Sequence, residues 1–188
     1  MARRDVARPD AVDGILAQWR RELPEVNAAP MAVFGRIHRV FLRYQVHVTD
    51  TFNSYGINAA AFDILAALRR NGAPYRQTAG ALAETSLITT GGISLRVDRL
   101  EKAGLVIRER DDEDKRVVYV QLTDKGLGLI EEVAAEHFAN EESLLVGLTA
   151  TERRQLAQLL SLLERSLDVY ETTSRTEEAG SDRFGDAV

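Results

Sequence analysis

The sequence predicts a mainly helical fold that carries one small β-hairpin. Apolar residues recur at helical spacing along most of the 188 residues. The spacing changes to alternation only at 105–110 and 116–122, which bracket a charged, turn-forming loop at 111–115. All four prolines fall between periodic segments, and none follows Pro74. The chain is therefore expected to be a series of helices interrupted once by a hairpin.

Each expected helix has its own apolar stripe and its own boundary signals. Asn58 is a capping residue for the third helix, and Thr149-x-x-Glu152 is a capping box that opens the last one. The chain ends, 1–10 and 172–188, are expected to be a flexible arm and a disordered tail. The stripes include Ile15, Leu16 and Trp19; Val33, Phe34 and Ile37; Phe62, Leu65 and Leu68; Ala79 and Leu82; Ile93, Val97 and Leu100; Leu127, Ile130 and Val133; and Leu156, Leu159 and Leu160. The expected helices span 11–23, 31–55, 58–70, 76–84, 89–102, 123–145 and 149–171.

The composition is that of a soluble globular protein, with 45% hydrophobic and 28% charged residues. The absence of cysteine excludes a disulfide scaffold, an iron–sulfur centre, a zinc finger and a thiol nucleophile. No apolar stretch is long enough to span a membrane, and the basic N-terminal segment lacks the apolar run of a secretory signal. We therefore expect a cytoplasmic protein without a membrane partner.

The net charge of −5 hides an asymmetry along the chain. Residues 131–188 carry five basic and thirteen acidic residues, a net charge of −8. Residues 1–130 carry 19 basic and 16 acidic residues, a net charge of +3. Because phosphate contacts depend on the local field, the overall acidity does not exclude binding to DNA.

Two helices joined by a tight turn and followed by a hairpin form a winged helix-turn-helix. In this arrangement the second helix, expected at 89–102, fits the major groove of DNA, where base edges are distinguishable. Its exposed face offers hydroxyls, glycines that allow close backbone approach, and long basic side chains. The alternative is that the small polar residues only cap the helix. The candidate DNA-contacting residues on this helix are Thr89, Thr90, Gly91, Gly92, Ser94, Arg96 and Arg99.

Residues 58–145 resemble the MarR family of bacterial ligand-responsive transcriptional regulators. The resemblance rests on two stretches, Gly91-Gly92…Arg99-Leu-Glu-Lys-Ala-Gly-Leu-Val106 and Asp111-Asp-Glu-Asp-Lys-Arg116…Leu122-Thr-Asp-Lys-Gly126. It implies a homodimer whose two winged-helix lobes straddle a palindromic operator in double-stranded DNA, most often as a repressor. The implied organisation is N-terminal helices for dimerisation and ligand binding at 11–57, a DNA-binding lobe at 58–122 and C-terminal dimerisation helices at 123–171.

The dimer is also suggested by apolar positions that a small winged helix would not cover by itself. These positions lie in the second and last expected helices. The alternative is that the two helices pack only within their own chain. The candidate dimerisation residues are Phe34, Ile37, Phe41, Leu159, Leu160 and Leu163.

The wing loop departs from the family at one position, since Glu113 stands where an arginine is usual. By resemblance, Arg116 enters the minor groove and Asp114 orients it. The additional acid should weaken the attraction of the wing to phosphate. The alternative is a solvated turn without a specific role.

The segment before the second helix resembles the N-terminally extended, urate-responsive and PecS-type subgroup of the family. The subgroup implies a ligand site made of Trp19, Asp63, Arg96 and Arg108. An arginine pair can hold a planar anion, and an indole can cover its face. The same arginines would also suit a tricarboxylate or an aromatic carboxylate. The alternative gives Trp19 a core role and places Asp63 in a structural ion pair.

No enzyme signature competes with this interpretation. The three histidines are dispersed without a metal-ligand spacing, and no Gly-rich phosphate loop or nucleophile elbow is present. No catalytic residue, metal or cofactor is therefore expected. The competing hypothesis from another class is a winged-helix protein-interaction module that does not bind DNA.

Overall fold

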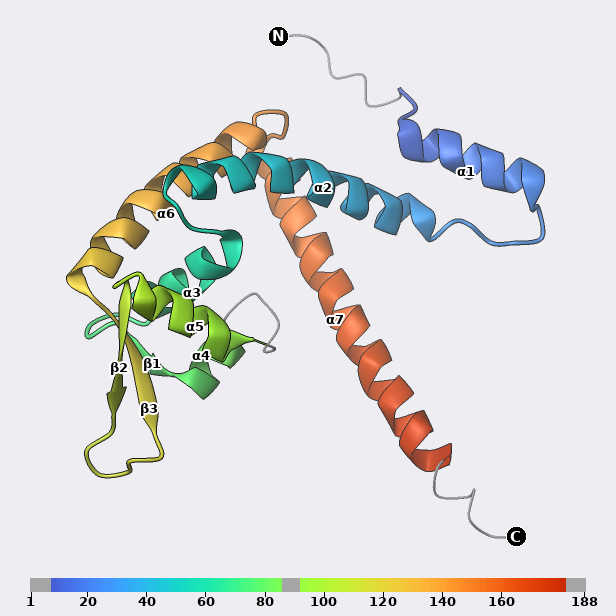
Figure 1. The fold of residues 1–188 in the computed structure, drawn as a ribbon. Coiled ribbons are helices and arrows are strands. Elements are labelled where there is room, and N and C mark those ends of the chain that lie inside the picture. The colour runs from blue at the N-terminus through green and yellow to red at the C-terminus, as the bar shows by residue number, and fades with distance from the viewer. Residues whose placement is uncertain (1–7, 86–91, 182–188) are drawn as a thin grey trace, which may run out of the picture. The chain divides into compact units, whose positions relative to one another are not determined.

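The computed structural model describes residues 8–85 and 92–181, and it is mostly helical with one small antiparallel sheet (Figure 1). The chain divides into two compact units, with the division after Asn140. The elements are α1 (Ala11–Glu22), α2 (Met31–Ser54), α3 (Ala59–Arg70), β1 (Arg76–Thr78), α4 (Ala79–Thr85), α5 (Ile93–Lys102), β2 (Val106–Arg110), β3 (Val118–Leu122), α6 (Asp124–Leu144) and α7 (Ala150–Ser181).

The core of the first unit is formed where α3 meets α5, the sheet and α6. The apolar stripe of α3 is fully buried at Ile64, Leu65 and Leu68. The stripe expected for α5 is also buried, and that of α6 is buried at Ile130 and Val133 and partly buried at Leu127. Burial of one apolar face by each helix is the main stabilising contribution here, because α3 and α5, with 12 and 10 residues, are too short to be stable alone.

The sheet has the order β1-β3-β2, and both pairs are antiparallel. The hairpin β2–β3 is the expected wing, with Val106 opposite Leu122 and Arg110 opposite Val118. Strand β1 was not expected, since Arg76 was placed at the start of a helix. The three residues of β1 are extended because they pair with β3, and the buried Gln77 side chain also donates to the Ala67 carbonyl over 3.1 Å. Tertiary pairing overrides local helical preference here.

The helix that was expected at 89–102 begins later. Gly92 has a φ of 90°, in the left-handed region, so the backbone is not helical there and α5 starts at Ile93. Thr89, Thr90 and Gly91 lie outside the described residues. Strand β3 likewise starts at Val118 rather than at residue 116.

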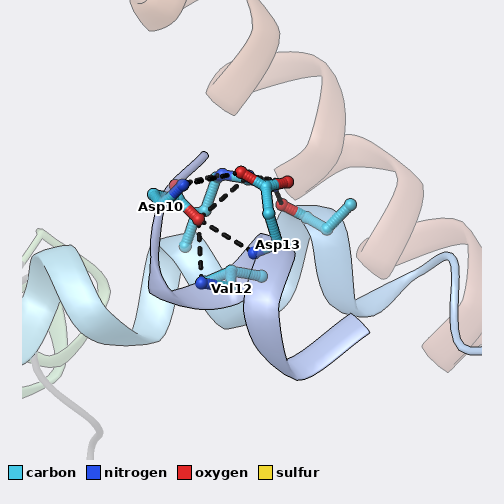
Figure 2. Close-up of polar contacts among 5 residues, drawn as sticks. Asp10, Val12 and Asp13 are labelled. Carbon is cyan, nitrogen blue, oxygen red and sulfur yellow. Dashed lines mark hydrogen bonds and ion pairs between the residues drawn. The ribbon is translucent and has the colours of Figure 1, made fainter. Parts of the chain in front are cut away.

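The N-terminus of α1 is fixed to α2 by Asp10, so the expectation of a flexible arm over 1–10 is wrong at Asp10. Its side chain accepts hydrogen bonds from the Val12 and Asp13 amides over 2.8 and 3.0 Å, and the Asp13 side chain accepts one from the Asp10 amide (Figure 2). The Arg36 guanidinium of α2 donates to both carboxylates, over 2.9 and 3.1 Å to Asp10 and 2.8 Å to Asp13. Residues 1–7 lie outside the description.

Apolar packing completes the contact between α1 and α2. Val12 and Leu16 are buried on one face of α1. Gly35 of α2 leaves room for the Val12 side chain, since a Cβ at Gly35 would lie 3.3 Å from Val12 Cγ1. The two helices therefore associate through a small apolar contact with an ion-pair cluster at its edge.

The second unit contains the end of α6 and the long helix α7. The expected capping box is present, with the Thr149 amide 2.7 Å from Glu152 Oε2 and the Glu152 amide 3.3 Å from Thr149 Oγ1. The expectation of disorder from residue 172 is wrong up to Ser181, where α7 ends. Residues 172–181 contain no proline, and extending a helix is easier than starting one. Residues 182–188 lie outside the description.

In the described ranges, 8–85 and 92–181, no helix combines the length and the apolar character needed to cross a membrane.

Candidate nucleic-acid interface

Helix α5 presents two different faces. Ile93, Val97 and Leu100 are buried at helical spacing and fix it on the core. The opposite side exposes Ser94 and Arg99 to solvent. A short helix with a polar, basic outer face and an apolar inner face is what groove recognition requires.

The wing loop is organised by its acidic residues. Asp111 accepts hydrogen bonds from the amides of Glu113 and Asp114, each over 2.9 Å, and this closes the turn. Asp114 in turn accepts two hydrogen bonds from the Arg116 guanidinium, at 3.0 Å to each oxygen. The Arg116 side chain is nevertheless 90% exposed. The loop therefore holds a basic side chain in a defined direction toward solvent.

The hydrogen bonds also set the charges in this loop. The Arg116 guanidinium, and then its backbone amide, lower the pKa of Asp114 below its usual range. The amides of Asp114 and Glu113 lower the pKa of Asp111 in the same way. Asp114 raises the pKa of Arg116 further. Asp114 and Arg116 are therefore a fully ionised pair at neutral pH.

Of the four predicted ligand residues, Arg96 lines a pocket, and Arg108 is engaged in other contacts. Arg108 of β2 pairs with Asp98 and Glu101 of α5, at 2.5 and 2.6 Å. In the part of the chain that the structure describes, no ion pair joins Asp63 to Arg96 or to Arg108. The sequence interpretation missed the two acidic partners of Arg108. The available signal was two acids three residues apart on a helix, followed by a strand whose arginine lies on the same face as the buried Val106.

Asp63 and Arg96 have buried polar atoms that lack partners among the described residues. Asp63 is 6% exposed, and its Oδ2 accepts no hydrogen bond there. The Nη1 atom of Arg96 is also buried without an acceptor. Arg96 lines a pocket of about 680 Å³ at the junction of α2, α3 and α5. The other lining residues are Asn53, Gly56, Ile57, Asn58, Ala60, Ala61, Arg99, Leu100, Ala103 and Leu105.

Trp19 does not line this pocket. It lies on α1, and 43% of the residue is exposed. It is therefore neither a buried core residue nor part of the pocket of this chain. Its assignment to the ligand site stays a prediction.

The candidate dimerisation residues are largely open to solvent in the single chain. On α2, Phe34 and Phe41 are about half exposed, while Ile37 is partly buried. On α7, Leu159 is 64% exposed and Leu160 is also exposed, while Leu163 is partly buried. Exposed leucines and phenylalanines in such number indicate surfaces that a partner covers.

No group of three or more His, Asp or Glu side chains among residues 8–85 and 92–181 could hold a metal ion. His137, one of the three dispersed histidines, is buried against the rings of Phe52 and Phe62.

Comparison with known proteins assigns the chain to a family. The model of the MarR family matches residues 55–117. The HTH-type transcriptional regulator PecS of Dickeya dadantii is 38% identical over 162 residues, which cover 86% of this chain and 98% of PecS. The chain belongs to the MarR family. Another relative, the HTH-type transcriptional regulator MhqR of Bacillus subtilis, is 27% identical over 130 residues, which cover 69% of this chain and 88% of MhqR.

Solved structures of DNA-binding proteins share the fold. A mutant MarR from E. coli in complex with operator DNA has a TM-score of 0.63 and 26% identity, covering 73% of this chain and 99% of its own. BpsR of Bordetella bronchiseptica, whose DNA binding is regulated by 6-hydroxynicotinic acid, has a TM-score of 0.64 and 26% identity, covering 70% of this chain and 92% of its own. The winged helix-turn-helix predicted from the sequence is confirmed.

Proposed function

We propose that this MarR-family protein is a sequence-specific DNA-binding transcriptional regulator, and that it is a repressor released from its operator by a small anionic ligand. One observation carries the DNA-binding part. Helix α5 exposes a polar, basic face beside a wing in which Asp114 holds Arg116 toward solvent. A regulator of this kind acts where the DNA is, so we propose a cytoplasmic location.

The two DNA-contacting elements have different tasks in this proposal. Ser94 and Arg99 of α5 face the major groove, where a guanidinium can donate two hydrogen bonds to a guanine. Arg116 enters the neighbouring minor groove, with Asp114 limiting its orientations. The acidic residues of the wing loop, including Glu113, repel phosphate. The favourable electrostatic contact between the loop and DNA is therefore made by Arg116.

This function is tested by measuring, with fluorescence anisotropy, the affinity of the protein for the DNA upstream of its own gene. Arg116→Ala should weaken operator binding about tenfold or more. Lys115→Ala is the matched control, because it removes the same charge from the same loop and should cost clearly less. If the wild-type protein binds the upstream DNA no better than an unrelated duplex, the protein-interaction alternative is favoured and the DNA-binding proposal fails.

The dimer is proposed to bury the exposed apolar positions of α2 and of α7 against a second copy of the chain. An obligate dimer would bury more than about 2,000 Å² in total. Two lobes related by a two-fold axis would then match a palindromic operator. Sedimentation at micromolar concentration should show a dimer, and a stable monomer would contradict this part.

The ligand proposal rests on Arg96 and Asp63. A buried guanidinium nitrogen and a buried carboxylate oxygen without partners are costly, and a ligand that offers both an acceptor and a donor would satisfy them. A planar anion such as urate has both kinds of group. Because Arg96 lies on α5, an anion that attracts its guanidinium would also move this helix, which contacts DNA.

Thermal unfolding and DNA release, measured together, test the ligand. Urate should raise the thermal midpoint, since binding to the folded state stabilises it, and it should lower operator affinity by reciprocal coupling. Arg96→Ala should remove both effects. If a tricarboxylate or an aromatic carboxylate acts and urate does not, the pocket stands and the urate assignment fails. If no anion acts, the ligand site is rejected.

A further inference from the structure

The Arg108 side chain makes an unusually complete set of contacts with the helix beside it. Its Nη2 donates to Asp98 Oδ1 over 2.5 Å and to the Ser94 carbonyl over 3.1 Å, and its Nη1 donates to Glu101 Oε2 over 2.6 Å. Its backbone amide also donates to Glu101 Oε1 over 3.2 Å. The side chain is only 28% exposed, so solvent screens these contacts incompletely.

These acceptors span almost the whole length of α5. Ser94 lies in the first turn of this ten-residue helix, Asp98 in its middle and Glu101 in its last turn. One side chain from the wing strand therefore contacts every turn of α5. Partial burial by itself would lower the pKa of the Arg108 guanidinium, but the hydrogen bonds to Asp98 and Glu101 raise it above its ordinary value.

Apolar packing by itself does not fix the rotation of α5 about its own axis. The helix is buried along a single stripe of three residues, Ile93, Val97 and Leu100. Apolar contacts are not directional, so such a stripe tolerates small rotations of a helix about its own axis. Hydrogen bonds from a planar guanidinium to carboxylates are directional and fix one geometry.

We propose that Arg108 is a positioning residue that fixes the rotation of α5 against the wing, and so determines how well the protein discriminates its operator from other DNA. The proposal rests on the proposed DNA-binding function and deepens it. Recognition of base edges needs side chains held within about 0.5 Å and 10–20° of the productive geometry. Contacts to phosphate depend mainly on charge and tolerate more movement.

A second effect of Arg108 acts on charge. Asp98 and Glu101 lie on the same helix as Arg96 and Arg99, which are proposed to face an anionic ligand or DNA. Without Arg108 the two carboxylates would be left unpaired on the DNA-binding lobe and would repel phosphate. Loss of charge and loss of orientation therefore have to be separated in the experiment.

The experiment measures affinity for the upstream operator and for an unrelated duplex of equal length, at one salt concentration, by anisotropy. Arg108→Ala should lower the ratio of the two affinities about tenfold, because specific contacts depend on orientation. Arg110→Ala is the matched control. It removes the same charge two residues further along β2 from an exposed side chain, so it should weaken both complexes similarly and leave the ratio unchanged.

Two further variants separate charge from geometry. Arg108→Lys keeps the charge, but an ammonium group cannot donate to both carboxylates in the geometry of a planar guanidinium. The ratio of operator affinity to unrelated-duplex affinity should therefore also fall. This variant serves equally if Arg108→Ala does not fold. Arg108→Ala combined with Asp98→Asn and Glu101→Gln removes the unpaired acids, so it should recover affinity for both duplexes without recovering the ratio.

The possible failures are distinguishable. If the wild-type protein shows no preference for the operator, the proposed DNA-binding function fails and this inference fails with it. If the wild-type protein prefers the operator but Arg108→Ala and Arg108→Lys keep the wild-type ratio, the positioning role is overturned and the DNA-binding function stands. A lower thermal midpoint with an unchanged ratio would show that Arg108 only stabilises the fold.

Discussion

Gly126 lies in the first turn of α6, directly against the backbone that joins α5 to β2. A Cβ built at this position would be 2.0 Å from the Leu105 carbonyl oxygen and 2.9 Å from its carbon. Neither atom is the movable end of a side chain, so the backbone itself would have to shift. The same oxygen accepts a hydrogen bond from the Thr123 amide over 3.1 Å, which the shift would also strain.

The expected cost of Gly126→Ala follows from these contacts. Overpacking costs about 1–3 kcal/mol, and the strained hydrogen bond adds about 1 kcal/mol. Replacing glycine by alanine in a helix returns about 1 kcal/mol. The free energy of unfolding should therefore fall by about 2 kcal/mol, which lowers the thermal midpoint by roughly 4–8 °C for a chain of this size.

Gly128 provides the matched control in the same helix. A Cβ there would meet no atom within 4 Å. Gly128→Ala should therefore raise the free energy of unfolding by up to about 1 kcal/mol, through helix propensity. Urea unfolding of both variants at equal protein concentration measures the difference. Equal stability of the two variants would refute the argument that Gly126 is required by the approach of α6 to Leu105.

Two further predictions concern ion pairs at the ends of helices. Arg36→Ala should release α1 from α2 and change the fluorescence of Trp19. Acid should do the same, because hydrogen bonds with backbone amides and with Arg36 lower the pKa values of Asp10 and Asp13 below the usual carboxyl range. Their stabilising contribution is therefore complete above that range and is lost as the pH falls through the lowered pKa values; Trp19 emission that stays unchanged until the whole chain unfolds in acid would contradict this. Arg153→Ala should destabilise the second unit by about 1–2 kcal/mol, because it removes hydrogen bonds of 2.6–3.1 Å to Glu142 and to two backbone carbonyls. If the variant unfolds in urea at the same concentration as the wild-type protein, Arg153 does not have this role.

Local patterns predicted the elements whose cause is local. The stripe of Ile93, Val97 and Leu100, the capping box at Thr149 and the alternation in the wing each depend on a few neighbouring residues. Strand β1 has only three residues, which is too short for a visible alternation, and its pairing with β3 is known only once the fold is known.

The site was predicted less completely for the same reason. The pair of Asp114 with Arg116 spans two residues, and the resemblance to the family indicated it. The contact of Arg36 with Asp10 spans 26 residues, and no local pattern marks it. Arg108 was assigned to the ligand on resemblance, whereas its partners are set by the angle between β2 and α5, which a one-dimensional pattern does not contain.

Recognition of a particular DNA sequence by α5 and the wing should leave a footprint of the full chain on the DNA upstream of its own gene. With unrelated DNA present in excess, we expect two protected stretches related by a two-fold axis, with centres one helical turn or a small multiple of it apart. Arg116→Ala should weaken the protection where the minor groove meets the wing. Uniform protection, or none at a concentration at which the protein is folded and dimeric, would contradict the account.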